Sequence, residues 1–281
     1  MRDLYGKVAV ITGGASGMGR AFADRFASEG MKVVLADIEG DALARAVDEL
    51  RTAGADVTGL RTDVASLADV EALRDHALDA FGGVHVVCSN AGVAGGAVVD
   101  APIELWRWVI GINLWGVIHG CHVFLPLLLE QDEGHIVNTA SLAGFVGSAG
   151  LGIYSTTKFA IVGLSESLYH DLAARGSQVG VSVLCPGFVQ TRIHVSHRNM
   201  PDDVRAVAAP PDLAADDTSS RIMAIGIPAD DVAVQVVQAV TEPRFFVLTH
   251  PRAARGAVES HLAWMDENVP GELDLEALLR P

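Results

Sequence analysis

Short runs of apolar, β-branched residues alternate with longer amphipathic stretches along most of the chain. The runs predict strands over residues 7–11, 32–36, 57–62, 84–89, 135–140, 179–184 and 245–249. The first six are almost continuously apolar rather than alternating. That pattern is typical of a parallel sheet covered on both faces.

Amphipathic stretches with helical spacing separate these runs. They predict helices over residues 17–28, 41–52, 67–80, 103–129 and 156–174, one over 255–267, and a short one over 273–279. Because strands and helices alternate, right-handed crossovers should place helices on both faces of the sheet. The expected fold class is therefore α/β: a doubly wound Rossmann-type parallel sheet of about seven strands, in a single domain over residues 1–281.

The segment 190–228 interrupts this alternation. It contains Pro201, Pro210 and Pro211 with several aspartates, and no continuous helical pattern runs through it. It could be a surface linker or a lid that folds over a ligand. Because it follows a strand end, where α/β sheets bind ligands, we expect a substrate-binding lid. Residues 251–281 are expected to form a C-terminal tail.

Composition narrows the class of protein. Of the 281 residues, 50% are hydrophobic, and the formal net charge is −15. Such a charge repels phosphate backbones and anionic lipid, so neither nucleic acid nor membrane is an expected partner. Cys88, Cys121 and Cys185 lie in apolar runs without C-x-x-C spacing, which is typical of buried thiols in a reducing compartment. The first apolar run, residues 8–11, is too short for a signal peptide, so we expect a cytoplasmic location.

A glycine-rich motif joins the first predicted strand to the first predicted helix. It comprises Thr12, Gly13, Gly14, Ala15, Ser16, Gly17, Met18 and Gly19. The glycines permit a tight turn and close approach to a pyrophosphate, which free N–H groups at the helix N-terminus would bind. The spacing of Gly13, Gly17 and Gly19 differs from G-x-G-x-x-G. The strand–turn–helix context nevertheless favours a dinucleotide site.

Polar residues follow the next strands. Asp37 ends the second strand, where a carboxylate can accept hydrogen bonds from ribose hydroxyls and repel the additional phosphate of NADP. No Arg or Lys stands at Ala15 or Ile38 to receive that phosphate, so the expected cofactor is NAD. Helix capping is the alternative role of Asp37. Asp63 and Asn90 are expected near the adenine and the inner ribose, although each could be a turn residue.

Tyr154 and Lys158 lie four residues apart and share one face of a helix. A free phenol, with a pKa of about 10, is a poor base at neutral pH. An ammonium about 4 Å away, at an effective dielectric of about 20, would stabilise the phenolate by about 4 kcal/mol. Ser141, 13 residues before Tyr154, follows a strand and could bring a second hydroxyl to the same point. Asn113, inside a predicted helix, could distort that helix and hold a water for proton relay, or make a plain polar contact.

These residues, in this order, resemble the short-chain dehydrogenase/reductase family, in its one-domain, NAD-preferring branch. The likeness runs from about residue 7 to residue 191 and covers the glycine motif, Asp37, Asp63 and Val64, residues 89–92, Asn113, Ser141, Tyr154, Lys158, Pro186 and Gly187, and Thr191. The resemblance implies an NAD-dependent alcohol dehydrogenase or ketone reductase.

The resemblance also implies a role for each residue. Tyr154 would transfer the proton, Lys158 would lower its pKa and hold the nicotinamide ribose, Ser141 would position the substrate oxygen, and Asn113 would anchor a relay water. Cofactor-binding residues would be Thr12, Gly13, Ser16, Gly17, Met18, Gly19, Asp37, Ile38, Asp63, Val64, Asn90, Ala91, Gly92, Tyr154, Lys158, Pro186, Gly187, Val189 and Thr191. Ser89 departs from the family's usual Asn, and the last strand lacks the usual glycine-rich segment.

The sequence also suggests a substrate class, an oligomeric state and alternative functions. Apolar residues flanking the catalytic set suggest a medium-sized hydrophobic secondary alcohol or ketone; the expected substrate residues are Ser141, Ala143, Phe145, Leu151, Tyr154, Phe188 and Ile193. The chain is expected to form a homodimer, through helices 103–129 and 156–174, or a homotetramer. No metal is expected, and His119 and His122 are read as structural or interface residues. A nucleotide-binding regulator without turnover, and an epimerase or dehydratase on the same scaffold, are the alternatives.

Overall fold

The computed structural model describes residues 1–208, 220, 221, 223–268, 270 and 271. Its centre is a parallel sheet of seven strands in the order β3-β2-β1-β4-β5-β6-β7. The strands are β1 (Val8–Thr12), β2 (Lys32–Asp37), β3 (Val57–Arg61), β4 (Val86–Ser89), β5 (His135–Thr139), β6 (Gly180–Cys185) and β7 (Phe246–Leu248). The chain moves outward in one direction from β1 to β3 and in the other from β4 to β7. A topological switch point therefore lies between β1 and β4.

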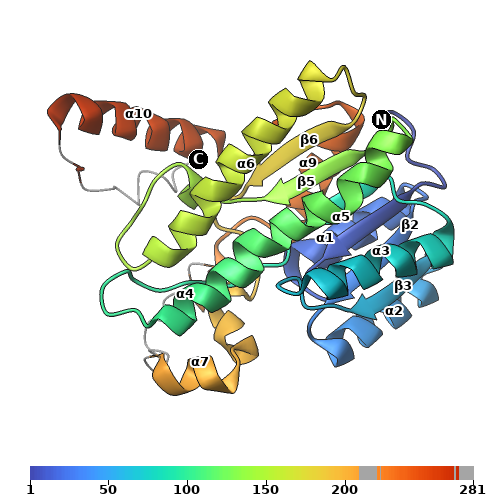
Figure 1. Ribbon diagram of the computed structural model, residues 1–281, viewed down its shortest axis with the longest axis horizontal. Coiled ribbons are helices and arrows are strands. Elements are labelled where there is room, and N and C mark those ends of the chain that lie inside the picture. The colour runs from blue at the N-terminus through green and yellow to red at the C-terminus, as the bar shows by residue number, and fades with distance from the viewer. Residues whose placement is uncertain (209–219, 222, 269, 272–281) are drawn as a thin grey trace.

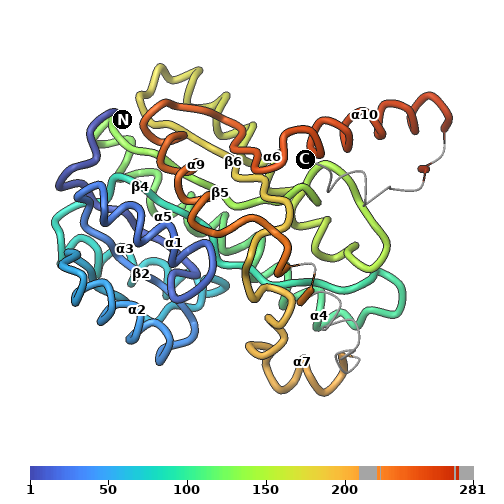
Figure 2. The backbone as a smooth tube through the Cα atoms, turned by 180° about the vertical axis from the view of Figure 1, so that it is seen from behind, coloured from blue at the N-terminus to red at the C-terminus, as the bar shows by residue number. Residues whose placement is uncertain are grey.

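Helices cover both faces of this sheet (Figures 1 and 2). One face carries α1 (Gly17–Ser28), α2 (Gly40–Thr52) and α9 (Ala229–Thr241), and the other carries α3 (Leu67–Phe81), α5 (Gly116–Glu130) and α6 (Gly152–Ala174). Successive residues of a strand point to opposite faces, so Ile11 packs under α1 and α9 whereas Val10 packs under α3 and α5. This confirms the α/β fold class.

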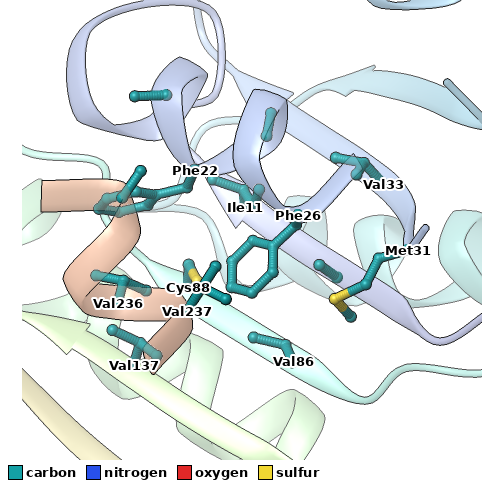
Figure 3. Packing of buried hydrophobic residues seen from close by; sticks show 14 of the residues in the cluster. Ile11, Phe22, Phe26, Met31, Val33, Val86, Cys88, Val137, Val236 and Val237 are labelled. Carbon is teal, nitrogen blue, oxygen red and sulfur yellow. The ribbon is translucent and has the colours of Figure 1, made fainter. Parts of the chain in front are cut away.

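The core beneath α1 is built from large side chains without exposure. Phe22 and Phe26 of α1 are fully buried against Ile11 and Val86 of the sheet and Val236 of α9 (Figure 3). Four residues separate Phe22 from Phe26, so both rings project from one face of the helix. This packing fixes α1, and with it the turn that leads from β1 into α1.

The predicted helix 103–129 is three segments. They are α4 (Ile103–Ile110), a π-helical turn (Gly111–Trp115) and α5 (Gly116–Glu130). Asn113 lies in the π turn, so the helix is distorted at the residue where a buried amide was expected to distort it. By length and composition alone, residues Ile103–Gln131 could also span a membrane, but half of that stretch is buried inside the protein, as in a core helix.

Other boundaries differ from the expectations. Helix α6 begins at Gly152, so Tyr154 lies in its first turn, and α10 (Pro251–Glu267) begins four residues before the predicted 255 because Pro251 is favourable at a helix start. Helix α9 was not predicted, although Asp230 and Asp231 in its first turn are a start signal. The predicted helix 273–279 lies outside the described residues.

The segment after β6 contains two further short helices. A 3₁₀ stretch (Ile193–Asn199) is followed by α7 (Asp202–Val207), and α7 packs against α4 (Figure 1). Val189 and Ile227 form a parallel bridge, so the two ends of the predicted 190–228 segment lie side by side. Part of this segment, including Pro210 and Pro211, lies outside the described residues.

Phe26→Ala is expected to lower the free energy of unfolding by about 3–5 kcal/mol, because it removes a fully buried ring and leaves a cavity under α1. Chemical denaturation followed by circular dichroism would measure the change. Leu262→Ala, at a side chain that is 59% exposed, is the control and should change stability by less than about 1 kcal/mol. Equal losses in the two variants would contradict this assignment of the core.

Candidate active site

A cavity of about 460 Å³ opens at the carboxyl ends of the parallel strands. It is lined by the turns after β1, β2, β3 and β4, by one face of α4 and the π turn, by Tyr154 and Lys158 of α6, and by the segment after β6. This is the edge at which open α/β sheets bind ligands, and the cavity spans the switch point between β1 and β4.

The glycine motif brings two backbones into close approach. Gly13 and Gly17 have φ values of 65° and 55°, which favour glycine. A Cβ on Gly13 would lie 3.0 Å from the Cα of Ala91, and a Cβ on Gly19 would overlap the Gly13 carbonyl. Side chains at these positions would force apart the turns after β1 and β4, which together line the cavity at the start of α1.

Thr12 joins the glycine motif to the turn after β4. Its hydroxyl accepts the N–H groups of Asn90 and Ala91 at 2.9 and 3.0 Å, and the Asn90 amide donates to the Thr12 carbonyl at 3.0 Å. The other amide atom, Asn90 Oδ1, is buried and has no hydrogen-bond partner among the described residues. It is an acceptor that a ligand hydroxyl could satisfy.

Asp37 ends β2 and lines the cavity. Its carboxylate accepts the N–H groups of Ala15 and Glu39, each at 3.0 Å. Burial raises the pKa of this carboxyl, and the backbone hydrogen bonds oppose the rise. These bonds hold the acid at the position where an adenosine ribose would lie.

Asn113 is fully buried and holds the loop after β4. Its Oδ1 accepts the Val93 N–H at 2.8 Å, and its Nδ2 donates to the Val93 carbonyl at 3.0 Å and to Thr157 Oγ1 at 3.3 Å. These contacts use both ends of the amide. The side chain therefore positions Val93 and lies behind the cavity wall.

Ser141, Tyr154 and Lys158 meet at the inner end of the cavity. The Ser141 hydroxyl hydrogen-bonds to the Tyr154 phenol, and the Lys158 Nζ lies 5.3 Å from the centroid of the Tyr154 ring. Lys158 is 3% exposed and donates to the Thr139 carbonyl at 2.8 Å. The strand end and the first two turns of α6 thus converge as the sequence suggested.

The pKa values of this set are governed by burial. Burial lowers the pKa of Lys158 to about 8. Burial also raises the pKa of the Tyr154 phenol, and the hydrogen bond with Ser141 opposes that rise. The Lys158 ammonium lies over the Tyr154 ring and donates to the Thr139 carbonyl, so burial has a larger effect on the pKa of the phenol than this neighbouring charge has.

The chain is similar to known proteins over most of its length. Residues 7–202 match the family model for short chain dehydrogenases. The chain is 39% identical over 254 residues to a 1-deoxy-11-beta-hydroxypentalenate dehydrogenase of Streptomyces exfoliatus, covering 89% of this chain and 85% of that protein. It is 32% identical over 258 residues to a CLA biosynthesis dehydrogenase/reductase of Lactiplantibacillus plantarum, covering 89% and 90%. The chain belongs to the short-chain dehydrogenase/reductase family.

A solved member of this family is closely similar in structure. The short-chain dehydrogenase/reductase from Burkholderia phymatum, solved in complex with NAD, superposes with a TM-score of 0.92 at 48% identity, covering 97% of this chain and 99% of that chain. The family and its relatives' names make this chain an oxidoreductase that interconverts alcohols and ketones with a nicotinamide cofactor.

Many of the expected site residues of this short-chain dehydrogenase/reductase line the cavity. They are Gly13, Ser16, Gly17, Met18, Asp37, Ile38, Asp63, Val64, Asn90, Ala91, Gly92, Tyr154, Lys158, Pro186, Thr191 and Ile193. Thr12, Gly19 and Asn113 lie behind the wall and shape it. Gly187 is packed against His250, and Val189 is buried under α1 and α9.

The expected substrate residues are only partly brought together. Of these residues, Tyr154 and Ile193 line the cavity, and Ser141 contacts Tyr154. Ala143, Leu151 and Phe188 lie outside the cavity wall. Phe145 packs instead against Phe246, with ring centroids 5.9 Å apart, because the short 3₁₀ turn after β5 directs it toward β7.

Several cavity residues were not expected. They are Glu39, Arg61, Thr62, Ala65, Val93, Arg107, Trp108, Gly111, Ile112, Thr139, Ala140, Arg192, Ser196, Arg198, Asn199 and Pro201. Trp108 is half-buried against the core and also lines the cavity. The four-residue spacing of Trp108 and Ile112 beside Gly111 was the signal that could have identified this face of α4.

The described part of the chain contains no cluster of His, Cys, Asp and Glu side chains able to hold a metal. His119 Nδ1 donates to the Val64 carbonyl at 2.9 Å, so this histidine supports the loop after β3. This is a structural contact, as expected for that histidine.

Lys158 makes stability depend on pH. Its folded-state pKa of about 8 is below the ordinary 10.5, so the buried charge destabilises the fold by about 3 kcal/mol below pH 8, and the penalty is relieved as pH rises from 8 to 10.5. Lys158→Met is therefore expected to raise the free energy of unfolding at pH 7 by about 1–3 kcal/mol and to flatten its slope between pH 8 and 10. Urea denaturation at several pH values would measure both effects.

The control for this measurement is Lys32→Met, at a half-buried lysine over the Phe81 ring. This variant should leave the slope between pH 8 and 10 in place. An unchanged slope in Lys158→Met would show that the ammonium is not the group that titrates.

Proposed function

We propose that this chain is an NAD-dependent short-chain alcohol dehydrogenase or ketone reductase, in which Tyr154 is the general acid/base. The observation that carries the proposal is the meeting of a phenol, a serine hydroxyl and a buried ammonium beside a cavity of about 460 Å³ at the carboxyl ends of the parallel strands. Its first test is stopped-flow absorbance of the nicotinamide over a panel of secondary alcohols and ketones. Binding without redox change across the panel would favour a nucleotide-binding regulator instead.

The residues present fit a nicotinamide dinucleotide. Gly13 and Gly17 line the cavity at the start of α1 without a side chain, and Asn90 Oδ1 is a buried acceptor that has no partner among the described residues. The Asp37 carboxylate is fixed by the Ala15 N–H at the end where we place the ribose. We assign the pyrophosphate to Gly13 and Ser16 through Gly19, the adenosine to Asp37, Ile38, Asp63 and Val64, and the nicotinamide half to Asn90 through Gly92, Lys158, Pro186, Gly187, Val189 and Thr191. Bound NAD would supply the hydride acceptor for alcohol oxidation.

The chain's own residues would manage the proton. Ser141 donates to or accepts from the substrate oxygen and orients it, and Tyr154 removes the hydroxyl proton during oxidation or donates it during reduction. Burial raises the pKa of the phenol, so a further positive charge beside it is needed for Tyr154 to act as a base. Lys158 supplies part of that charge, and an oxidised nicotinamide supplies more when bound. Asn113 fixes Val93 and so the loop that borders the substrate.

We propose NAD rather than NADP because Asp37 is a half-buried acid that lines the cavity at the end where we place the adenosine ribose. A 2′-phosphate beside this carboxylate would bring two like charges together. The Burkholderia phymatum enzyme, solved with NAD, supports the assignment.

A hydrophobic alcohol or ketone of medium size is the proposed substrate class. The names of the relatives from Streptomyces exfoliatus and Lactiplantibacillus plantarum refer to hydroxypentalenate and to CLA biosynthesis. Val98, which is exposed, packs on Gly152, and Leu151, the residue before Gly152, is also exposed. Ile193 lines the cavity. These apolar side chains, near the start of α6 and Tyr154, support the proposal.

We also propose a single domain, a lid and a homodimer. The described part of segment 190–228 forms the lid, and residues 251–281 form the tail. The dimer would use the outer faces of α5 and α6, where an apolar groove includes Ile118, Leu125, Leu164 and Leu168. A tetramer is the alternative.

The cysteines bear on the cellular location. All three are free and two of them are fully buried, which supports a reducing, cytoplasmic location.

Tyr154→Phe is expected to lower kcat by about 10²–10⁴-fold while leaving NADH affinity within about twofold, because the ring stays and only the proton-transferring oxygen is lost. Steady-state kinetics and NADH fluorescence titration would measure the two effects. Tyr169→Phe, at a half-exposed ring on the same helix, is the control. Unchanged turnover in Tyr154→Phe would remove the phenol from the mechanism.

Asp37→Ala is expected to lower the ratio of kcat/KM for NAD over that for NADP by about tenfold or more, corresponding to about 1.4 kcal/mol. The loss of charge repulsion would improve NADP use, and the loss of ribose hydrogen bonds would weaken NAD use. Asp41→Ala, in the first turn of α2, is the matched control. A ratio that stays constant in Asp37→Ala would contradict the charge argument.

A further inference from the structure

A strap crosses the mouth of the cavity. We use this name for residues 191–199, which follow β6 and include the 3₁₀ stretch Ile193–Asn199. At its start, Thr191 lies beside the glycine motif, since a Cβ on Gly17 would be 3.2 Å from the Thr191 Cγ2. In its middle, Ser196 is 4% exposed and its hydroxyl accepts the Ala94 N–H at 2.8 Å. The strap thus touches the turns after β1 and β4.

At its far end, the strap is fastened to the loop after β2. The Oε1 of Glu39 accepts Arg198 Nε at 3.0 Å, Arg198 Nη2 at 2.7 Å and Asn199 Nδ2 at 2.8 Å. Glu39 is only two residues beyond Asp37, and Glu39, Arg198 and Asn199 all line the cavity. This contact joins the strap to the ribose end of the site.

The guanidinium of Arg198 is held in place from within the strap. Its Nη1 donates to the carbonyls of Arg192 and Val195 at 3.3 and 3.1 Å, which leaves Nε and Nη2 directed at Glu39. A pre-organised guanidinium loses little entropy when it binds an acid. The side chains of Arg198 and Glu39 are 31% and 28% exposed, so solvent screens their charges only partly. The ion pair is therefore stronger than one between freely moving surface side chains.

We propose that Glu39 and Arg198 form a latch with two effects: it keeps the strap closed over the cofactor, and it prevents Arg198 from binding a phosphate at the adenosine ribose. The inference rests on the proposed function, since it requires a nicotinamide dinucleotide in this cavity. With the latch made, Glu39 neutralises Arg198. Without Glu39, an uncompensated guanidinium faces the ribose end and attracts the additional phosphate of NADP. Glu39 is thus a second determinant of cofactor choice, with its partner on the strap.

The two sides of the latch can be separated by mutation. Glu39→Ala and Arg198→Ala both break the ion pair, but only Glu39→Ala leaves a free cation at the ribose end. The double variant removes both charges. Glu259→Ala is the matched control, because it breaks an exposed Arg255–Glu259 pair of 2.7 Å on α10, away from the cavity. Thermal unfolding would show that the fold of each variant is retained.

Two readouts test the two effects. Trapping of released NADH in a stopped-flow fluorimeter should show dissociation about fivefold faster in both single variants and unchanged in Glu259→Ala. The kcat/KM for NADP should rise about tenfold in Glu39→Ala alone, and the double variant should lose most of that gain.

Two results would overturn the latch. One is NADH dissociation that stays at the wild-type rate in both single variants. The other is an NADP gain of equal size in Glu39→Ala and the double variant, which would exclude Arg198 as the phosphate ligand. Failure of the wild-type protein to bind NADH would overturn the proposed function and the latch together, so the two failures are distinguishable.

Discussion

The site depends on the close approach of two backbones at the carboxyl ends of β1 and β4. Neighbouring parallel strands hold the two chain segments together up to their last residues, and beyond them the Thr12 hydroxyl continues the connection by accepting two N–H groups of the opposite turn. Glycine at positions 13 and 19 then allows a separation that no side chain would permit. Cofactor loop and catalytic half of the sheet are therefore aligned by the fold itself, before any ligand contributes.

The same fold also destabilises the charged form of the proposed catalytic residues Tyr154 and Lys158. Parallel strands covered on both faces place the start of α6 deep in the protein, where an ammonium and a phenol are both poorly solvated. The protein tolerates this because the large apolar clusters on the two faces of the sheet supply stability elsewhere. Active sites that need unusual pKa values are commonly less stable locally than the rest of the fold.

Sequence predicted the parts of the structure that depend on local pattern. Short apolar, β-branched runs predicted seven strands, six of them almost continuously apolar, and the sheet has seven strands. The glycine motif, Asp37, Tyr154 and Lys158 were proposed because their chemistry needs a fixed position relative to a strand end, and they line the cavity. Contacts between distant segments were not visible. Glu39 and Arg198 are 159 residues apart, and nothing local marks them as partners. Phe145 was misplaced for a related reason: an apolar residue near a site can face the core or the ligand, and only tertiary packing decides.

The π turn at Gly111–Trp115 joins α4 to α5 and affects which side chains of the two helices face inward. A π turn contains one residue more than an α-helical turn, and each residue of an α-helix advances the side chains by about 100°. Before it, Trp108 faces the ligand; after it, Val117 and Phe124 face the sheet and His119 reaches the Val64 carbonyl. A single-residue deletion in this turn would therefore restore an ordinary α-helical turn and leave the direction of α5 nearly unchanged. Its local effect would be to move Asn113 away from the position in which its side chain bonds to Val93.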